Sequence, residues 1–416
     1  MVVAAAAAVL PAGCGGGPND PAPAPPKATP APPVVLATGL TESNAQLLWS
    51  ARARPEAPAG FGPWRDRLAG LRPRYLRVPV YWSQLQPDPA TPPDLAKPAD
   101  GCLRGIAPCA PFAGLREELQ AIASLQQAAP RGTAPQVEVV ISGVPGWAAE
   151  PPTGCERSDA GPDSRPITQE GIAAYRSLIE RLVALGAETG AELRYFSPWN
   201  EPNHPTFISP QRGTCLAAAP SVAPAIYAQL VRAAHDALDA APGDQQLVLG
   251  EMAGTTTPSP RRSTVQEMVA ALPDDVACAS RLWSQHDYAT LLPEPGKPDP
   301  ITTLEAALDA RPCTRGAHIW VTETGVGGPR PGGDRPTDDV SLRAGCRAQD
   351  DALRRWAEDP RVDVAFQYTF REDTAYPVGL ADAALTRTYP TYELWKAWGA
   401  RDPSAPPPAL PAGCQG

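Results

Sequence analysis

Eight short apolar runs, separated by amphipathic stretches, are the feature that most constrains how this 416-residue chain can fold. Apolar runs of this length are typical of buried parallel strands, and stretches with i, i+3, i+4 apolar spacing are typical of the helices that connect them. The predicted strands are Val34–Leu40, Tyr75–Val80, Val137–Ser142, Arg194–Pro198, Gln246–Gly250, Leu282–His286, His318–Thr322 and Val362–Tyr368. The predicted helices are Phe112–Ala128, Gly171–Leu185, Ala223–Leu238, Thr264–Leu272, Thr302–Ala310, Leu342–Glu358 and Pro390–Trp398.

Eight strand–helix units favour an α/β fold of the (β/α)8 TIM-barrel type, although a doubly wound open sheet would give much the same alternation. One barrel domain would cover residues 34–400 and leave a C-terminal tail at 401–416. Long segments follow the second and third predicted strands, at 81–111 and 147–168. In a barrel, these loops would surround the end at which the strands terminate.

The composition excludes several classes of function. A net charge of −9 and an isoelectric point near 5.1, without any cluster of Lys or Arg, argue against a nucleic-acid partner. The sequence contains no G-x-S-x-G, H-E-x-x-H or Walker motif and no C-x-x-C pair. We therefore expect neither a metal nor a cofactor.

The first residues point to a location outside the cytoplasm. Residues 1–14, MVVAAAAAVLPAGC, form an apolar run too short to span a bilayer and end on small residues before Cys14. They resemble a lipoprotein signal peptide, in which Cys14 would carry the lipid and so provide the chain's membrane contact. An ordinary cleaved signal with a spare cysteine is the alternative. The Pro- and Ala-rich residues 15–33 would then link this end to the barrel of a cell-surface or secreted protein.

The nine cysteines predict four disulfides. Without Cys14 an even number remains, as expected in an oxidising compartment, and about 105 pairings are formally possible. Cysteines that bracket one loop, lie in adjacent loops or precede neighbouring strands are the closest partners, and the remaining two would join a helix to the tail. This favours the pairs Cys102–Cys109, Cys155–Cys215, Cys278–Cys313 and Cys346–Cys414.

Two glutamates follow predicted strands in similar contexts. Glu201 comes after the fourth strand, within Trp199-Asn200-Glu201-Pro202, and Glu323 after the seventh, within Val321-Thr322-Glu323-Thr324-Gly325. A single glutamate at a strand end is often a solvated surface charge. In a barrel, however, both would project from the end where active sites form. One carboxylic acid facing one carboxylate is the arrangement that hydrolyses a glycosidic bond.

These motifs resemble the clan A retaining glycoside hydrolases, a group of (β/α)8 barrels, with families 5 and 39 the nearest. The resemblance extends over most of the predicted barrel and includes, besides the two glutamate motifs, Tyr75–Trp82 with Gln86-Pro87, Val144–Trp147 and Trp283–Tyr288. It implies that Glu201 is the acid/base and Glu323 the nucleophile. We expect Glu323 to be ionised and Glu201 to begin protonated, because the charge of Glu323 and partial burial would favour the neutral acid.

The resemblance also implies supporting residues for a carbohydrate substrate. Arg77, His286 and Tyr288 would support the glutamates, and Asn200 would bind the 2-hydroxyl of the sugar. Trp147 would stack on a sugar ring, Tyr368 stands where the clan commonly has a tryptophan, and Glu251 is a further candidate for sugar contact. The implied function is hydrolysis of a β-linked glycan without a cofactor. The alternatives are a transglycosylase and a non-catalytic glycan-binding surface protein.

Overall fold

The computed structural model describes residues 36–416, with the exception of 157–159, 289–290, 292–295, 328–333 and 403–404. The described residues belong to one compact unit, Pro33–Gly416. The predicted signal peptide at 1–14, including Cys14, and the predicted linker at 15–33 lie outside the described residues.

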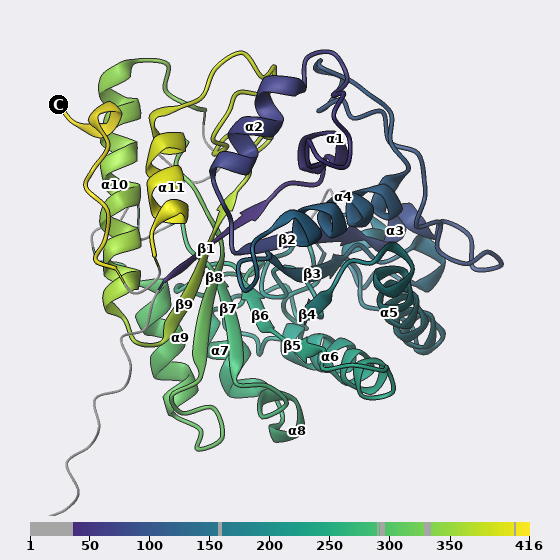
Figure 1. Ribbon diagram of the computed structural model, residues 1–416. Coiled ribbons are helices and arrows are strands. Elements are labelled where there is room, and N and C mark those ends of the chain that lie inside the picture. Colours follow the sequence, from purple (N-terminus) through teal and green to yellow (C-terminus); the bar gives the residue numbers. More distant parts are fainter. Residues whose placement is uncertain (1–35, 157–159, 289–290, 292–295, 328–333, 403–404) are drawn as a thin grey trace, which may run out of the picture. The chain divides into compact units, whose positions relative to one another are not determined.

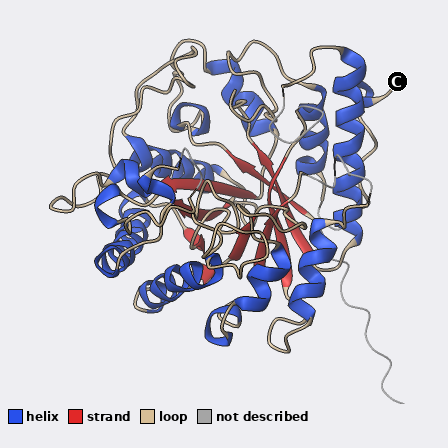
Figure 2. Ribbon diagram, turned by 180° about the vertical axis from the view of Figure 1, so that it is seen from behind, coloured by secondary structure: helices blue, strands red, loops and turns tan. Residues whose placement is uncertain are grey.

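All strands belong to one parallel sheet with the order β5-β4-β3-β2-β1-β9-β8-β7-β6. The strands are β1 (Ala37–Thr41), β2 (Tyr75–Tyr81), β3 (Gln136–Ser142), β4 (Leu193–Ser197), β5 (Gln246–Leu247), β6 (Leu249–Met252), β7 (Leu282–His286), β8 (His318–Thr324) and β9 (Val362–Tyr368). Figure 2 shows them gathered in the middle, with helices around them.

The sheet curls into a nearly closed barrel because its fifth strand is divided. β5 pairs with β4, and β6 pairs with β7, so the two halves, which flank Val248, occupy one position of an eight-membered barrel. Gly250 has φ +106°, and a Cβ atom there would lie 2.3 Å from the Ser284 carbonyl oxygen, so only glycine fits. The predicted (β/α)8 fold is confirmed, whereas the continuous fifth strand Gln246–Gly250 is wrong. β7, β8 and β9 are the sixth, seventh and eighth barrel strands.

The helices surround the barrel, and the predicted ones are confirmed with shifted ends (Figure 1). They are α1 (Ala45–Leu48), α2 (Gly62–Gly70), α3 (Trp82–Leu85), α4 (Gly114–Ala128), α5 (Gln169–Thr189), α6 (Ala223–Asp239), α7 (Val265–Ala271), α8 (Asp274–Ala277), α9 (Pro300–Asp309), α10 (Asp339–Glu358) and α11 (Pro390–Ala400). The sequence did not predict the short helices α1, α2, α3 and α8. None of the described helices combines the length and apolar character needed to cross a membrane.

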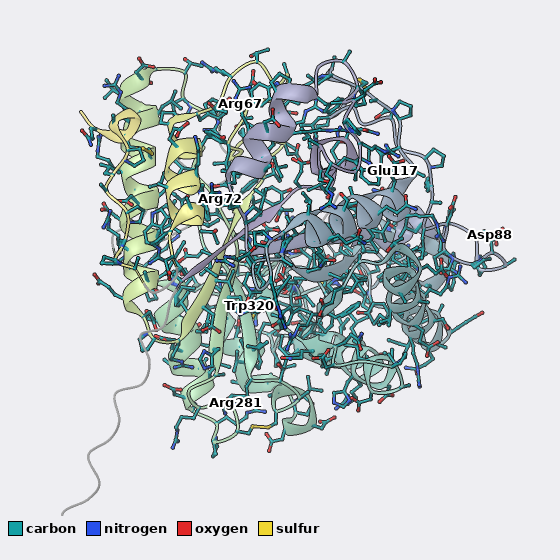
Figure 3. The ribbon with its side chains drawn as sticks, in the orientation of Figure 1. Arg67, Arg72, Asp88, Glu117, Arg281 and Trp320 are labelled. Atoms are coloured by element: carbon teal, nitrogen blue, oxygen red, sulfur yellow. A yellow bond between two sulfur atoms is a disulfide. The ribbon has the colours of Figure 1, made fainter. Side chains whose placement is uncertain are left out.

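Aromatic side chains fill the interior of the barrel at one level. Trp320 of β8 lies with its ring centroid 4.6 Å from that of Tyr195 and 5.1 Å from that of Tyr75, and Phe366 completes the cluster. Figure 3 labels Trp320 among the strands. Gly39 of β1 provides room for this layer, because a Cβ atom there would lie 2.3 Å from the Phe366 ring. The barrel is therefore a packed core rather than a pore.

The four predicted disulfides are confirmed: Cys102–Cys109, Cys155–Cys215, Cys278–Cys313 and Cys346–Cys414. The last one joins α10 to the C-terminal residues. Arg347 strengthens this attachment by donating to the carbonyl oxygens of Cys414, at 3.1 Å, and Gly416, at 2.9 Å. The described residues of 401–416, which we expected to form a tail, thus belong to the same compact unit as the barrel.

We predict that the disulfide between α10 and the C-terminal residues stabilises the fold more than the one within a single loop. Cys346–Cys414 closes 68 residues and Cys102–Cys109 closes 7, so chain entropy assigns them about 4 and about 2 kcal/mol. Urea unfolding of the two Cys→Ala double variants measures the difference. An equal loss, or a greater loss for the Cys102/Cys109 variant, would contradict the prediction.

Candidate active site

A cleft of about 950 Å³ opens where the barrel strands end. Its lining comes from β2, β3, β7, β8 and β9 and from the loops that follow the strands, including the one after β4. The predicted site residues in this lining are Arg77, Asn200, Glu201, His286, Tyr288, Glu323 and Tyr368. Most of the predicted supporting residues therefore meet at one place, although they are spread over nearly 300 positions of the chain.

The backbone around each glutamate departs from regular strand geometry. Glu201 follows β4 with φ +38°, and its N–H donates to the carbonyl oxygen of Glu251 at 2.8 Å. Glu323 lies inside β8, which runs two residues further than predicted, and a register shift in the β7–β8 ladder pairs it with His286. Such irregularities re-aim side chains at the ends of strands. As a result, oxygens of the Glu201 and Glu323 carboxylates come within 4.8 Å of each other.

Two donors hold the carboxylate of Glu323. Arg77 Nη1 donates to Oε1 at 2.8 Å, and the Tyr288 hydroxyl donates to Oε2 at 3.1 Å. Burial and the charge of Glu323 raise the pKa of Tyr288, so this hydroxyl remains a donor. The two hydrogen bonds fix the orientation of the Glu323 carboxylate.

His286 connects three carboxylates. Its Nδ1 lies 2.9 Å from Glu201 Oε1 and 3.3 Å from Glu323 Oε2, and its Nε2 lies 3.1 Å from Glu251 Oε2. Burial would lower the pKa of His286, but the charge of Glu323 and the hydrogen bonds to Glu201 and Glu251 outweigh burial and raise it to about 10. His286 is therefore an imidazolium that donates from both ring nitrogens.

The expected protonation of Glu201 is wrong for the free site. Burial raises the pKa of Glu201, but the hydrogen bond and the charge of His286 outweigh burial and lower it overall. The prediction from the sequence took the charge of Glu323 into account but not the positive charge of His286 next to Glu201. In the free protein, the shared proton of this pair thus belongs to His286.

Glu201, His286 and Glu323 could also be considered as metal ligands, since one ligand atom of each lies within 4.8 Å of the others. A metal would need a lone pair on His286 Nδ1. Nδ1 of His286, however, lies 2.9 Å from Glu201 Oε1, and the raised pKa of His286 favours a proton there, which a metal would have to displace.

Two predicted binding residues do not reach the cleft. Trp147 packs edge-on against Trp82, with ring centroids 5.9 Å apart, and its indole N–H donates to the Gln86 carbonyl oxygen at 2.9 Å. Glu251 is fully buried and does not line the cleft. It accepts hydrogen bonds from Arg77 and His286, so its position is beneath the site rather than against a sugar.

Three residues of the site were not identified from the sequence. His204 Nδ1 lies 3.8 Å from Glu201 Oε2, and Tyr81 and Tyr376 line the cleft. The ring of Tyr376 is 5.0 Å from that of Tyr288 and 6.1 Å from that of Tyr368. His204 follows Glu201 by three positions, which was a usable signal, whereas Tyr376 belongs to a loop without any pattern.

The barrel resembles several solved structures at low sequence identity, and two of the three described next are named as glycosidases. SrfJ from Salmonella typhimurium matches with a TM-score of 0.56 and 10% identity, over 91% of this chain and 76% of that one. A GH39 β-xylosidase from Caulobacter crescentus matches with a TM-score of 0.55 and 14% identity, over 89% of this chain and 72% of that one. A glucosidase from Croceicoccus marinus matches with a TM-score of 0.53 and 13% identity, over 89% of this chain and 69% of that one. No protein-family model and no curated protein matches the chain. The resemblance to clan A is thus confirmed for the fold.

We predict that His286 stabilises the fold in a pH-dependent manner. The pKa of His286, about 10 in the folded protein, lies above the value of about 6.5 in an unfolded chain. The stabilisation is therefore complete below about pH 6.5 and is lost as the pH rises toward 10. Relative to His286→Asn, the unfolding free energy of the wild type should show its largest excess near pH 6 and a shrinking excess toward pH 10.

His318→Asn is the matched control, because His318 is half exposed and contacts Asp363 at the opposite end of β8. The unfolding free energy of His318→Asn should stay close to that of the wild type over the whole pH range. If the difference in unfolding free energy between the wild type and His286→Asn is constant or grows with pH, His286 is neutral in the folded protein.

Proposed function

We propose that this protein is a retaining glycoside hydrolase that cleaves a β-linked glycan, with Glu323 as nucleophile and Glu201 as acid/base. The observation that carries the proposal is the distance of at most 4.8 Å between oxygens of these two carboxylates across an open cleft. Retaining enzymes place their carboxyl groups about 5–5.5 Å apart, whereas inverting enzymes need about 6.5–9.5 Å to admit a water molecule. The fold shared with glycosidases supports the same assignment.

Glu323 has the surroundings of a nucleophile. Arg77 and Tyr288 each donate to one of its oxygens and hold the carboxylate in position for attack on the anomeric carbon. Attack forms a glycosyl ester on Glu323 and expels the leaving oxygen. The ester then reacts with water, which restores the carboxylate and retains the anomeric configuration.

Glu201 and His286 act together as the acid and the base. The 2.9 Å hydrogen bond between them allows the proton of His286 to reach Glu201 Oε1 and, from there, the leaving oxygen. Formation of the ester removes the charge of Glu323 that holds this proton on His286. The step therefore leaves neutral His286 beside ionised Glu201, and this pair accepts the proton of the attacking water in the second step.

The rest of the cleft suits a sugar. Arg77 Nη2 donates to Asn200 Oδ1 at 2.7 Å, which leaves the Asn200 amide N–H₂ as the donor for a sugar hydroxyl. Tyr81, Tyr368 and Tyr376 supply aromatic faces and hydroxyl groups around Glu323. Aromatic walls with a few polar groups are typical of carbohydrate clefts.

The protein would act outside the cytoplasm. Four disulfides fit an oxidising, extracytoplasmic compartment. Together with the apolar residues 1–14 and Cys14, they support secretion or attachment to the cell surface through a lipid. The substrate would then be an extracellular or envelope oligosaccharide or polysaccharide.

We predict distinct kinetic effects for the two glutamates. Glu323→Gln should abolish turnover of aryl β-glycosides regardless of the leaving group, because an amide cannot form the ester. Glu201→Gln should slow the hydrolysis of substrates with a poor leaving group by about 10²–10⁴-fold, because these leaving groups need protonation. It should slow the hydrolysis of substrates with an activated leaving group much less. Initial rates and the anomeric configuration of the first product, followed by NMR, measure both effects.

Glu393→Gln on α11 is the matched control, since Glu393 is an exposed acid that contacts Lys396. It should behave as the wild type. Near wild-type turnover in either site variant, or an inverted product, would contradict the assignment. A wild-type protein that binds glycans but hydrolyses none would favour a glycan-binding role, and products longer than the substrate would favour a transglycosylase.

A further inference from the structure

Glu138 is a buried acid in an otherwise apolar strand. It lies in β3 between Val137 and Val139, is 0% exposed, and pairs in register with Arg77 on β2. Its Oε1 accepts a hydrogen bond from the Ser197 hydroxyl at 2.7 Å. Glu138 does not line the cleft, and the proposed reaction makes no direct use of it.

The second carboxyl oxygen of Glu138 faces another acid. Glu138 and Glu251 lie within hydrogen-bonding reach of each other, and both are 0% exposed. Each of the two residues has one buried carboxyl oxygen, Glu138 Oε2 and Glu251 Oε1, that has no hydrogen-bond donor in the described part of the chain. Thr322 also lies near Glu251. Two carboxyl groups are thus in contact at the centre of the barrel.

Such a contact requires one proton. Two ionised carboxylates at this distance in a desolvated interior repel each other strongly, whereas one acid and one carboxylate form a short, strong hydrogen bond. Glu251 Oε2 already accepts from Arg77 Nε and Nη2 and from His286 Nε2, so Glu251 is the charged partner. Glu138 receives a single neutral hydroxyl and is therefore the protonated partner.

The electrostatics of the two groups agree with this assignment. Burial, and then the charge of Glu251, raise the pKa of Glu138 well above its usual range. For Glu251, burial acts in the same direction, but Arg77 and His286 outweigh it and lower the pKa of Glu251.

We infer that Glu138 is a positioning residue: as a neutral carboxylic acid it donates to Glu251 and thereby orients the carboxylate that holds Arg77 and His286 against Glu323 and Glu201. The chain of contacts runs from Ser197 through Glu138 and Glu251 to both cations, and from these to both glutamates of the cleft. This inference rests on the proposed function for its kinetic consequences only. The protonation of Glu138 stands independently.

Infrared spectroscopy of the full protein tests the protonation directly. At pH 8 the wild type should show the carbonyl band of a buried neutral carboxylic acid, and Glu138→Gln should lose it. Glu118 of α4 is the matched control, since it is also fully buried with a pKa raised by burial, but is not part of the chain of contacts that leads from Glu138 to the cleft. Glu118→Gln and the double variant separate the two bands. A Glu138→Gln spectrum with the same acid band as the wild type would overturn the inference.

The ring nitrogens of His286 report the effect on the site. The chain has four histidines, so their ¹⁵N signals can be assigned by single substitutions. If Glu138 is neutral, Glu138→Gln keeps a donor to Glu251 without changing the charge, and the titration of His286 should stay as in the wild type. A midpoint for His286 that falls in Glu138→Gln would show that Glu138 carries a charge, which contradicts the inference.

Kinetics test the positioning role by comparing a variant with a donor and one without. Glu138→Met has a similar length but no donor, and should lower kcat by about 10²-fold with little change in KM, because Arg77 and His286 shift relative to the glutamates. Glu138→Gln should restore most of this loss and the pH profile. Equal loss in both variants would overturn the positioning role. If the wild type has no turnover, the proposed function fails, while the infrared and NMR results still decide on Glu138.

Discussion

A carboxylate without access to solvent, Glu251, holds together the charged groups on which the geometry of the cleft depends. Glu251 pairs with both Arg77 and His286, and together with Glu201 and Glu323 it allows a guanidinium and an imidazolium to remain in the interior of the barrel. Buried charges are tolerated only when they are paired and hydrogen-bonded, and removal of one partner typically costs about 3–5 kcal/mol. The same two cations then contact Glu323 and Glu201. Stability and the candidate chemistry thus share one network.

The backbone carries the irregularities that this network requires. Glu201 and Glu251 both have positive φ, at +38° and +51°, and the N–H of one donates to the carbonyl oxygen of the other. The divided fifth strand and the register shift at His286 lie in the same region. Such conformations persist only where the surrounding structure determines them. Here the aromatic layer around Trp320 fills the barrel beneath the site, so the strand ends can depart from regular geometry without loss of the core.

The sequence was sufficient for the architecture and for the acidic pair, because both follow from local patterns. Strand and helix periodicity predicted the barrel, and the position of each cysteine relative to those strands predicted all four disulfides. The motifs around Glu201 and Glu323 predicted that two carboxylates would meet. The sequence could not predict the partners of Trp147 and Glu251, or the charge on His286, because these depend on loop packing and on register shifts between strands. Glu138 is an example. The sequence shows a single acid in an apolar strand, but the protonation of Glu138 can be inferred only from its contact with Glu251.

The central claim is that Glu323 forms a covalent bond to the sugar while Glu201, about 5 Å away, handles the proton. Trapping the intermediate tests it most directly, with a panel of 2-deoxy-2-fluoro β-glycosides of differing stereochemistry that carry activated leaving groups. After proteolysis and mass spectrometry, the account predicts one fluorosugar per chain, attached to the peptide that contains Glu323, and no label in Glu323→Gln. A label on another residue, or hydrolysis of the parent sugar with no label from its fluoro analogue and with an inverted product, would contradict it.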